Sequence, residues 1–191
     1  MSQSNVSLLK HSARTLACGI LITATTFAVA GPASAAQSAC VNVDVAATTQ
    51  NTDAIRASVL CLINGERTKL RMPALRENAK LRKAALAHSS DMVRNGYFAH
   101  TGLDGDTLVD RIVASGYTRK NDGWSLGENL AWGTGDLGTA RGITDAWMNS
   151  SGHKANILKP AYREIGIGIR LGVPSDASVG ATFTTDFGVK L

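Results

Sequence analysis

The sequence predicts an α+β domain in which helices cover a small β-sheet. Over residues 53–149, apolar side chains recur at the three- and four-residue spacing of amphipathic helices. Over residues 164–188, apolar side chains instead alternate with small or polar ones, which is the pattern of β-strands. Helices followed by a terminal hairpin are typical of the α+β class. The chain has 191 residues, of which 44% are hydrophobic and 18% charged, so it is long enough for one domain with its own core.

The first 35 residues have the features of a secretory signal peptide. Lys10 and Arg14 form a positive segment, residues 15–30 are apolar, and Ala33-Ser34-Ala35 matches a cleavage site. An apolar run of about sixteen residues is short for a bilayer-spanning helix, which argues against the alternative of an uncleaved membrane anchor. We therefore predict a signal peptide over residues 1–35, a secreted, extracellular mature protein, and no stable membrane span after cleavage.

Residues 36–52 are small, polar and aperiodic, which predicts an extended N-terminal arm before the folded domain at residues 53–191. After cleavage the arm carries Cys40 and the domain carries Cys61. In an oxidising compartment such an even pair is expected to form a disulfide, the alternative being two free thiols. The bond would close a loop of about 20 residues.

The charge of the mature chain is modest. Without Lys10 and Arg14, 18 basic residues face 15 acids, a net charge of about +3. The basic side chains are scattered and are not interleaved with aromatic ones, so we predict no nucleic-acid partner.

Four helices are expected from the apolar spacing and from the signals at their ends. Thr52 or Asp53 is the expected cap of the first helix, and Asn78 can cap the second, which Gly96 ends. Trp147 lies on the inward face of the fourth helix. The predicted helices cover residues 53–70, 79–95, 107–115 and about 137–149.

Two antiparallel strands are expected near the C-terminus. They cover residues 164–173 and 179–188, with a turn at residues 174–176 between them. In the first strand, Gly166 and Gly168 carry no side chain and would let another backbone approach closely.

The candidate functional side chains are two histidines and one glutamate. His100 and His153 both closely follow predicted helices, at element ends where functional side chains concentrate. His88 lies on the inward stripe of the second helix and is read as a core histidine. Glu128 stands in "WSLGENLAWGTG", among glycines, leucines and two tryptophans, and is read as a partly buried carboxylate. The sequence holds no H-E-x-x-H helix and no G-x-S-x-G elbow, so spacing alone assigns no hydrolase class.

Several segments, in this order and at these separations, resemble the CAP superfamily: "YFAH", "GENLAWG", "AWMNSSGHKANIL" and "IGIGI…TFTTDFG". The superfamily contains cysteine-rich secretory proteins, antigen 5 and plant pathogenesis-related-1 proteins, and "LINGERTKLRMPALREN" is similar to its bacterial secreted branch. The resemblance spans about residues 55–188. It implies a single-domain α-β-α sandwich with about four helices around a small antiparallel sheet.

The resemblance also implies a site. In the superfamily a cavity gathers two histidines and two glutamates, and the histidines bind a divalent metal, often zinc, in some members. Ser150 stands where the second glutamate is expected, which implies that a metal here is weakly bound. The implied cavity residues are His100, Glu128, Asn129, Ser150 and His153, with His100 and His153 as metal ligands and Glu128 as the catalytic candidate.

Glu128 is therefore expected to face imidazoles in a polar cavity, where a hydrogen bond or a histidinium offsets its loss of hydration. Asn129 and the flanking glycines are expected to shape a turn that aims the carboxylate. The alternative is that Glu128 only accepts hydrogen bonds from backbone amides and stabilises the fold.

Three function classes follow from this sequence. The first is an extracellular binding module for a small apolar ligand, a lipid or an envelope component. The second is a metal-assisted hydrolase or peptidase that uses the same cavity. The third is a protein-interaction domain with a vestigial cavity. The missing second glutamate favours the binding module, and the sequence leaves open whether the protein is an enzyme.

Overall fold

The computed structural model describes residues 40–191; the predicted signal peptide and the first residues of the arm lie outside the described residues. The helices of the described part are α1 (Thr52–Lys69), α2 (Ala79–Asn95), α3 (Leu108–Ala114), α4 (Ala140–Met148), α5 (Ser151–Ile157) and the short 3-10 helix η1 (Gly135–Gly138). The strands are β1 (Arg76–Glu77), β2 (Trp124–Gly133), β3 (Glu164–Val173) and β4 (Asp176–Lys190).

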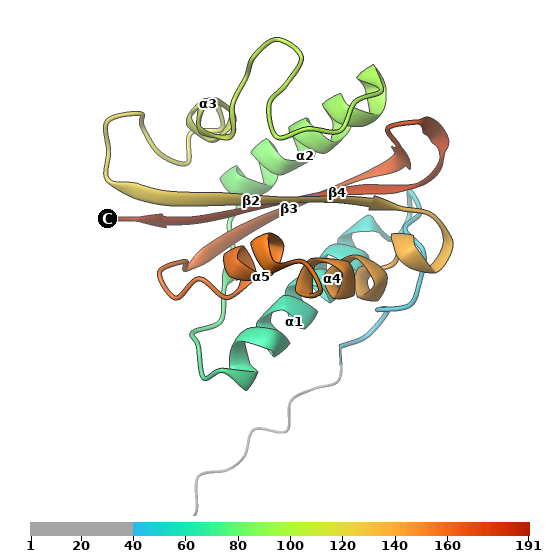
Figure 1. The fold of residues 1–191 in the computed structure, drawn as a ribbon, viewed down its shortest axis with the longest axis horizontal. Helices are drawn as coiled ribbons and strands as arrows, with labels where there is room; N and C mark the ends of the chain where they lie inside the picture. Colours follow the sequence, from blue (N-terminus) through green and yellow to red (C-terminus); the bar gives the residue numbers. More distant parts are fainter. Residues whose placement is uncertain (1–39) are drawn as a thin grey trace, which may run out of the picture. The chain divides into compact units, whose positions relative to one another are not determined.

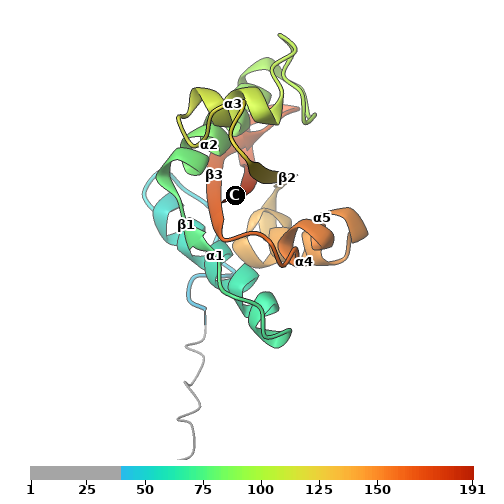
Figure 2. The same cartoon turned by 90° about the vertical axis from the view of Figure 1, so that its left-hand side faces the viewer.

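The strands form one sheet in the order β1-β3-β4-β2, with helices on both faces. Helices α2 and α3 lie on one face, and α1, α4 and α5 lie on the other (Figures 1 and 2). The predicted α+β class and the three-layer α-β-α arrangement are therefore confirmed. Two details were wrong. There are five α-helices in the described part instead of about four, and the short β1 pairs with β3 in parallel, so the sheet is mixed.

The predicted helices lie within a few residues of the observed ones because their end signals are local. The Asn78 side chain accepts hydrogen bonds from the backbone N–H groups of Lys80 and Leu81, and Gly96 ends α2 with a φ of 67°. The predicted cap of α1 was wrong. Asn51 occupies the cap position, and its side chain turns back to accept from the Thr48 N–H at 2.6 Å.

The segment predicted to be a turn around Glu128 is instead β2, which pairs with β4 along its whole length. Its glycines serve close packing. A β-carbon on Gly127 would lie 2.3 Å from the Tyr162 hydroxyl, and one on Gly133 would lie 2.3 Å from the Leu137 carbonyl. Glycine is needed at both positions because the Tyr162 hydroxyl and the Leu137 carbonyl fill the space that a side chain would occupy.

The predicted close approach to the first C-terminal strand is confirmed by α2. A β-carbon on Gly166 would lie 2.1 Å from the Arg82 backbone nitrogen, and one on Gly168 would lie 2.2 Å from that of Leu86. The backbone of α2 therefore packs directly on the sheet. This brings polar groups of the two layers together, as where the Ser89 hydroxyl donates to Thr184 at 2.8 Å.

The apolar core lies on the opposite face, under α1, α4 and α5. Trp147 is buried there, in one cluster with the isoleucines of β3 and with Phe183 and Phe187. Its indole N–H donates to the Leu130 carbonyl at 3.1 Å. Trp147 thus faces inward, as its position in the sequence predicts.

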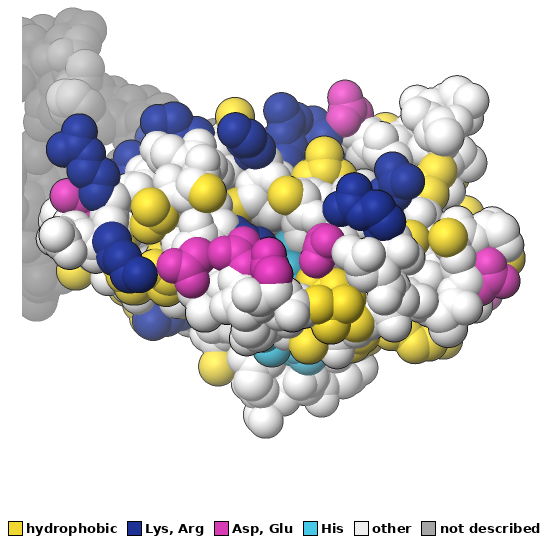
Figure 3. All heavy atoms as spheres, turned by 90° about the horizontal axis from the view of Figure 1, so that it is seen from above, with side chains coloured by type: hydrophobic (Ala, Val, Ile, Leu, Met, Phe, Trp, Pro, Cys, Tyr) yellow, Lys and Arg dark blue, Asp and Glu magenta, His cyan; other side chains and the backbone are white. Residues whose placement is uncertain are grey.

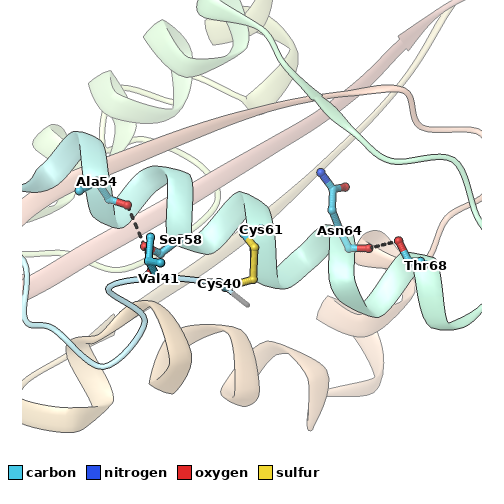
Figure 4. Close-up of a disulfide and its surroundings, with 7 residues drawn as sticks. All are labelled: Cys40, Val41, Ala54, Ser58, Cys61, Asn64 and Thr68. Atoms are coloured by element: carbon cyan, nitrogen blue, oxygen red, sulfur yellow. Dashed lines mark hydrogen bonds between the residues drawn. A yellow bond between two sulfur atoms is a disulfide. The ribbon is translucent and has the colours of Figure 1, made fainter. Parts of the chain in front are cut away.

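The arm is held along α1 by the predicted disulfide between Cys40 and Cys61 (Figure 4). One turn earlier in α1, the Ser58 hydroxyl donates to the Val41 carbonyl at 2.7 Å. The arm next reaches α4, where the Arg141 backbone N–H donates to Val43 at 2.9 Å. Within residues 40–191, none of the helices combines the length and the hydrophobicity that a bilayer crossing needs.

Candidate functional site

Glu128 lies in the middle of β2 with only 2% of its side chain exposed. It faces the α2 and α3 layer, because it is directly opposite Asp186, on the strand position that also pairs with Gly166. Both of its carboxylate oxygens have partners. Oε1 lies 2.7 Å from His100 Nδ1, and Oε2 accepts from an Arg111 nitrogen at 2.8 Å.

Arg111 is the residue that joins the parts of this site. It comes from α3, is buried, and pairs with Glu128. Its guanidinium also donates to the backbone carbonyls of His100 and Asp106, both at 2.9 Å. One side chain therefore fixes the loop that carries His100 against the strand that carries Glu128. The sequence carried no signal for this role, because an arginine in an amphipathic helix is normally solvent-exposed.

These contacts keep Glu128 ionised. Burial by itself would raise the pKa of Glu128, but the hydrogen bond with His100 and the charge of Arg111 outweigh it and hold the pKa below its ordinary value. The same hydrogen bond raises the pKa of His100. The expected pairing of Glu128 with an imidazole is thus present. Among residues 40–191 the carboxylate accepts no hydrogen bond from a backbone amide, which was the alternative.

His153 lies in the first turn of α5, on the other side of β2 from α2. The Asn129 side chain donates to the His153 backbone carbonyl at 3.0 Å, and Asn156 donates to Asn129 at 2.9 Å. Burial lowers the pKa of the His153 imidazole, and the charge of His100 lowers it further.

The bond to Glu128 decides how His100 could bind a metal. It occupies Nδ1, so Nε2 is the nitrogen left for a ligand. A metal-binding histidine commonly gives its other ring N–H to a carboxylate in this way. Within residues 40–191, no group of three or more histidine, cysteine, aspartate or glutamate side chains is arranged to hold a metal ion. The donor set is therefore at most the two imidazoles, His100 and His153.

Ser150 does not replace the missing carboxylate. It is the N-terminal boundary residue of α5, and its side chain caps none of the N–H groups of that helix. A second carboxyl group does lie next to Glu128, at a position that the sequence did not predict. Asp186 of β4 is fully buried opposite Glu128, and neither of its oxygens has a hydrogen-bond partner among the described residues.

Burial raises the pKa of Asp186 well above its ordinary value, and the negative charge of Glu128 adds to this effect. The two neighbouring carboxyl groups thus have pKa values pushed in opposite directions. Asp186 could have been suspected from Gly166 and Gly168. Because these glycines have no side chain, they indicate that a second layer packs closely on this face of the sheet, which is also the face of Asp186.

His88 is a buried side chain beneath the same loop. Its Nε2 lies 2.9 Å from the Ala99 carbonyl oxygen, and the residue is 1% exposed. The burial confirms that His88 lies on the inward face of the second helix.

The sequence matches known proteins over the same elements. A family model for the cysteine-rich secretory protein family, CAP, matches residues 60–181, more than half of the chain. The uncharacterized protein YkwD of Bacillus subtilis strain 168 is 36% identical over 115 residues, which are 60% of this chain and 42% of YkwD. The uncharacterized membrane protein YlbC of the same strain is 32% identical over 111 residues, 58% of this chain and 30% of YlbC. The chain thus spans less than half the length of either relative.

Solved structures share the fold. An outer surface protein of Borrelia burgdorferi has a TM-score of 0.58 at 24% identity, over 70% of this chain and 90% of that protein. An extracellular protein of Bacillus anthracis that contains an SCP domain has a TM-score of 0.53 at 25% identity, over 71% of this chain and 43% of that one. These neighbours are extracellular or outer-surface proteins. With the family model matched across β2, α4, α5 and β3, the chain belongs to the CAP, or cysteine-rich secretory protein, family.

Proposed function

We propose that this CAP protein is a secreted binding module that takes a small apolar ligand, a lipid or an envelope component beside the His100–Glu128 pair. The observation that carries the proposal is that both oxygens of Glu128 are already bonded inside the protein, at 2.7 and 2.8 Å. A carboxylate that is buried, doubly bonded and lowered in pKa is a poor base toward water. This supports a structural role for Glu128 and favours binding over hydrolysis.

Exposed apolar side chains next to this pair supply a contact surface. Phe98 and Leu103 flank His100 in one loop and are 45% and 70% exposed. Trp132, 46% exposed, is four residues from Glu128 on the same side of β2. Exposed large apolar side chains close to the hydrogen-bonded His100–Glu128 pair suit a ligand that is mostly apolar.

The test is a titration with a fluorescent fatty acid, cis-parinaric acid, which becomes brighter in an apolar site. Leu103→Ser should weaken binding about fivefold, because it removes roughly 1 kcal/mol of apolar contact. Leu137→Ser is the matched control, since Leu137 is 69% exposed but lies in η1 beside α4. Equal affinity of the two variants, or no binding by the wild type, would remove the apolar-ligand proposal.

A metal-binding function is the second candidate, supported by the Nδ1 bond that leaves Nε2 of His100 open. Zinc bound there would act as a Lewis acid or as a bridge to a ligand. Two imidazoles without a third protein ligand form a weak, open site, so we expect modest affinity that falls as the histidines protonate.

Calorimetric titration with zinc at neutral pH checks the metal proposal. His100→Ala and His153→Ala should each abolish binding, whereas Glu128→Gln should weaken it modestly by loosening His100. Binding that survives loss of either histidine would contradict the two-histidine site. If the protein binds neither zinc nor the fatty acid, the third class, an interaction domain with a vestigial cavity, becomes the better description.

A further inference from the structure

A concave site lies between α2, α3 and the loop at residues 101–106. It is a pocket of about 310 Å³ that shares Arg111 with the His100–Glu128 pair but is lined by neither His100 nor Glu128 nor His153. Figure 3 views the molecule from this side and shows acidic side chains gathered around a hollow in which a histidine is visible. The pocket is large enough for a small organic molecule and too small for a folded partner.

The charges around the pocket are only partly paired. An Arg94 guanidinium nitrogen lies 3.4 Å from a carboxylate oxygen of Asp91. The guanidinium of Arg111 is already bonded to the Glu128 carboxylate and to two backbone carbonyls. Three further charged residues line the pocket without an ion-pair partner among residues 40–191: Lys83, Asp104 and Asp106. The uncompensated charge is therefore one positive and two negative, so the pocket favours a cation.

His88 adds a buried acceptor to the same pocket. Its Nε2 bonds to the Ala99 carbonyl, which can only accept, so the ring proton is on Nε2 and the lone pair is on Nδ1. Nδ1 has no hydrogen-bond partner in the described part of the chain, although the residue is 1% exposed and lines the pocket. Burial also lowers the pKa of His88, which keeps the ring neutral at pH 7.

We propose that this pocket binds a small organic compound through a primary ammonium group. The carboxylates of Asp104 and Asp106 form no ion pair among residues 40–191, and Nδ1 of His88 can accept a hydrogen bond. An ammonium supplies N–H donors together with positive charge. In the described residues these side chains are not arranged as a metal shell, so separate donors on an organic ligand suit their spacing. The alanines of the wall, Ala84, Ala87 and Ala114, leave room for the ligand's body but offer little contact to an acyl chain. The site is independent of the apolar-ligand function.

Three amines test the shared chemistry and separate its sources: glucosamine for an amino sugar, putrescine for a polyamine and alanine amide for a peptide N-terminus. Each is titrated into the ¹⁵N-labelled mature protein, and amide shifts are followed by NMR. At least one amine should shift amides of α2, α3 and residues 101–106, at millimolar concentration or below. N-acetylglucosamine is the matched control for glucosamine, because acetylation removes the charge. It should bind at least tenfold more weakly.

Exposed charged residues give variants that keep the fold and act in opposite directions. Asp104→Asn should weaken amine binding about two- to fivefold, and Lys83→Gln should strengthen it by a similar factor because a like charge is removed. Asp145→Asn in α4 and Lys154→Gln in α5 make the same charge changes elsewhere and should have no effect. The opposite signs distinguish a ligand contact from a general loss of stability.

The proposal is overturned by any of three outcomes. N-acetylglucosamine could bind as tightly as glucosamine, which would make the pocket a neutral sugar site. Calcium or inorganic phosphate could shift the same amides at lower concentration than every amine. The third outcome is that no amine shifts the amides of α2, α3 and residues 101–106. None of these results would bear on fatty-acid binding beside His100, which the cis-parinaric acid titration of Leu103→Ser and Leu137→Ser tests separately.

Discussion

A buried glutamate needs partners that replace the water it loses, and Glu128 has two. The guanidinium of Arg111 and the imidazole of His100 together satisfy both oxygens, and each partner comes from a different segment of the chain. Removing one partner of such a buried pair leaves an uncompensated charge. The arrangement explains why a single carboxylate is tolerated in an otherwise apolar strand, and why it holds the loop around His100 in place.

Asp186 is the opposite case, because it is buried without a positive partner of its own. Its folded pKa is raised, so the folded protein holds the neutral acid more strongly than the unfolded chain does. As the pH rises above the ordinary value of 3.8, the unfolded chain loses its proton first and the protein loses stability. The loss continues until the pH passes the folded pKa.

Asp186→Asn should therefore stabilise the protein at neutral pH. At pH 7 the wild type must either hold a proton that the unfolded chain has lost or bury a charge, whereas the amide is neutral in both states, so the variant should be the more stable protein. The gain should shrink toward zero as the pH falls below 3.8, where both the folded protein and the unfolded chain hold the proton. Urea unfolding across this pH range measures it, with the exposed Asp145→Asn as control. A variant that is less stable than the wild type at pH 7 would show that the ionised carboxylate is needed.

At the scale of single elements, glycines decide how closely helices and strands can pack. Gly166 and Gly168 of β3 face α2, where the helix backbone occupies the space of their missing side chains. On the other face, Gly127 of β2 leaves room for the Tyr162 hydroxyl, and Gly133 leaves room for the Leu137 carbonyl. These positions are occupied by glycine because of close contact, since none of them has a positive φ.

Gly166→Ala should destabilise the protein by about 1–3 kcal/mol, the usual cost of forcing an extra carbon into a packed interior. Its added carbon would lie 2.1 Å from backbone atoms of α2, which cannot move away as a flexible side chain could. Gly152→Ala in α5 is the matched control. Its added carbon meets nothing, so the variant should gain up to about 1 kcal/mol from helix propensity. Thermal unfolding that shows a loss in both variants would mean that packing is not the cause.

At the scale of the whole molecule, distant segments are tied together by a few strong links. Arg67 at the end of α1 is fully buried, and its guanidinium donates to the carbonyls of Pro73, Ile157, Lys159 and Tyr162. This joins α1 to the chain that leaves α5. Burial lowers the pKa of Arg67, but four carbonyls replace its water and the charge is retained.

The disulfide is the other long-range link. Reducing Cys40–Cys61 should lower the free energy of unfolding by up to about 3 kcal/mol, the value for a closed loop of this length. The arm keeps its contacts with α4 through Val43 and Asp44, so it should stay docked in the reduced protein. Urea unfolding of the mature protein, with and without reductant, measures the loss. Two reactive thiols in the native protein would contradict the link.

How much of this protein could be predicted depends on the range of the forces involved. Helices α1 to α4, the β3–β4 hairpin and the inward face of Trp147 are visible in the sequence because apolar period and end signals are local. The family resemblance named His100, Glu128 and His153 as candidates. The expected small antiparallel sheet is corrected only by the parallel pairing of the short β1 with β3.

The tertiary structure alone decided what surrounds those residues. The glycines of "GENLAWG" favour a turn when the sequence is considered alone. The segment is a strand because it pairs with β4. That Arg111 and Asp186 belong to the site followed from α2 and α3 covering the second face of the sheet, which buries positions that would otherwise be exposed. Burial depends on contacts between segments far apart in the chain, and so does the pKa of each buried group. The sequence by itself therefore determined the family, the principal elements and the candidate residues, while the packing of two helical layers on one sheet decided their partners and their charges.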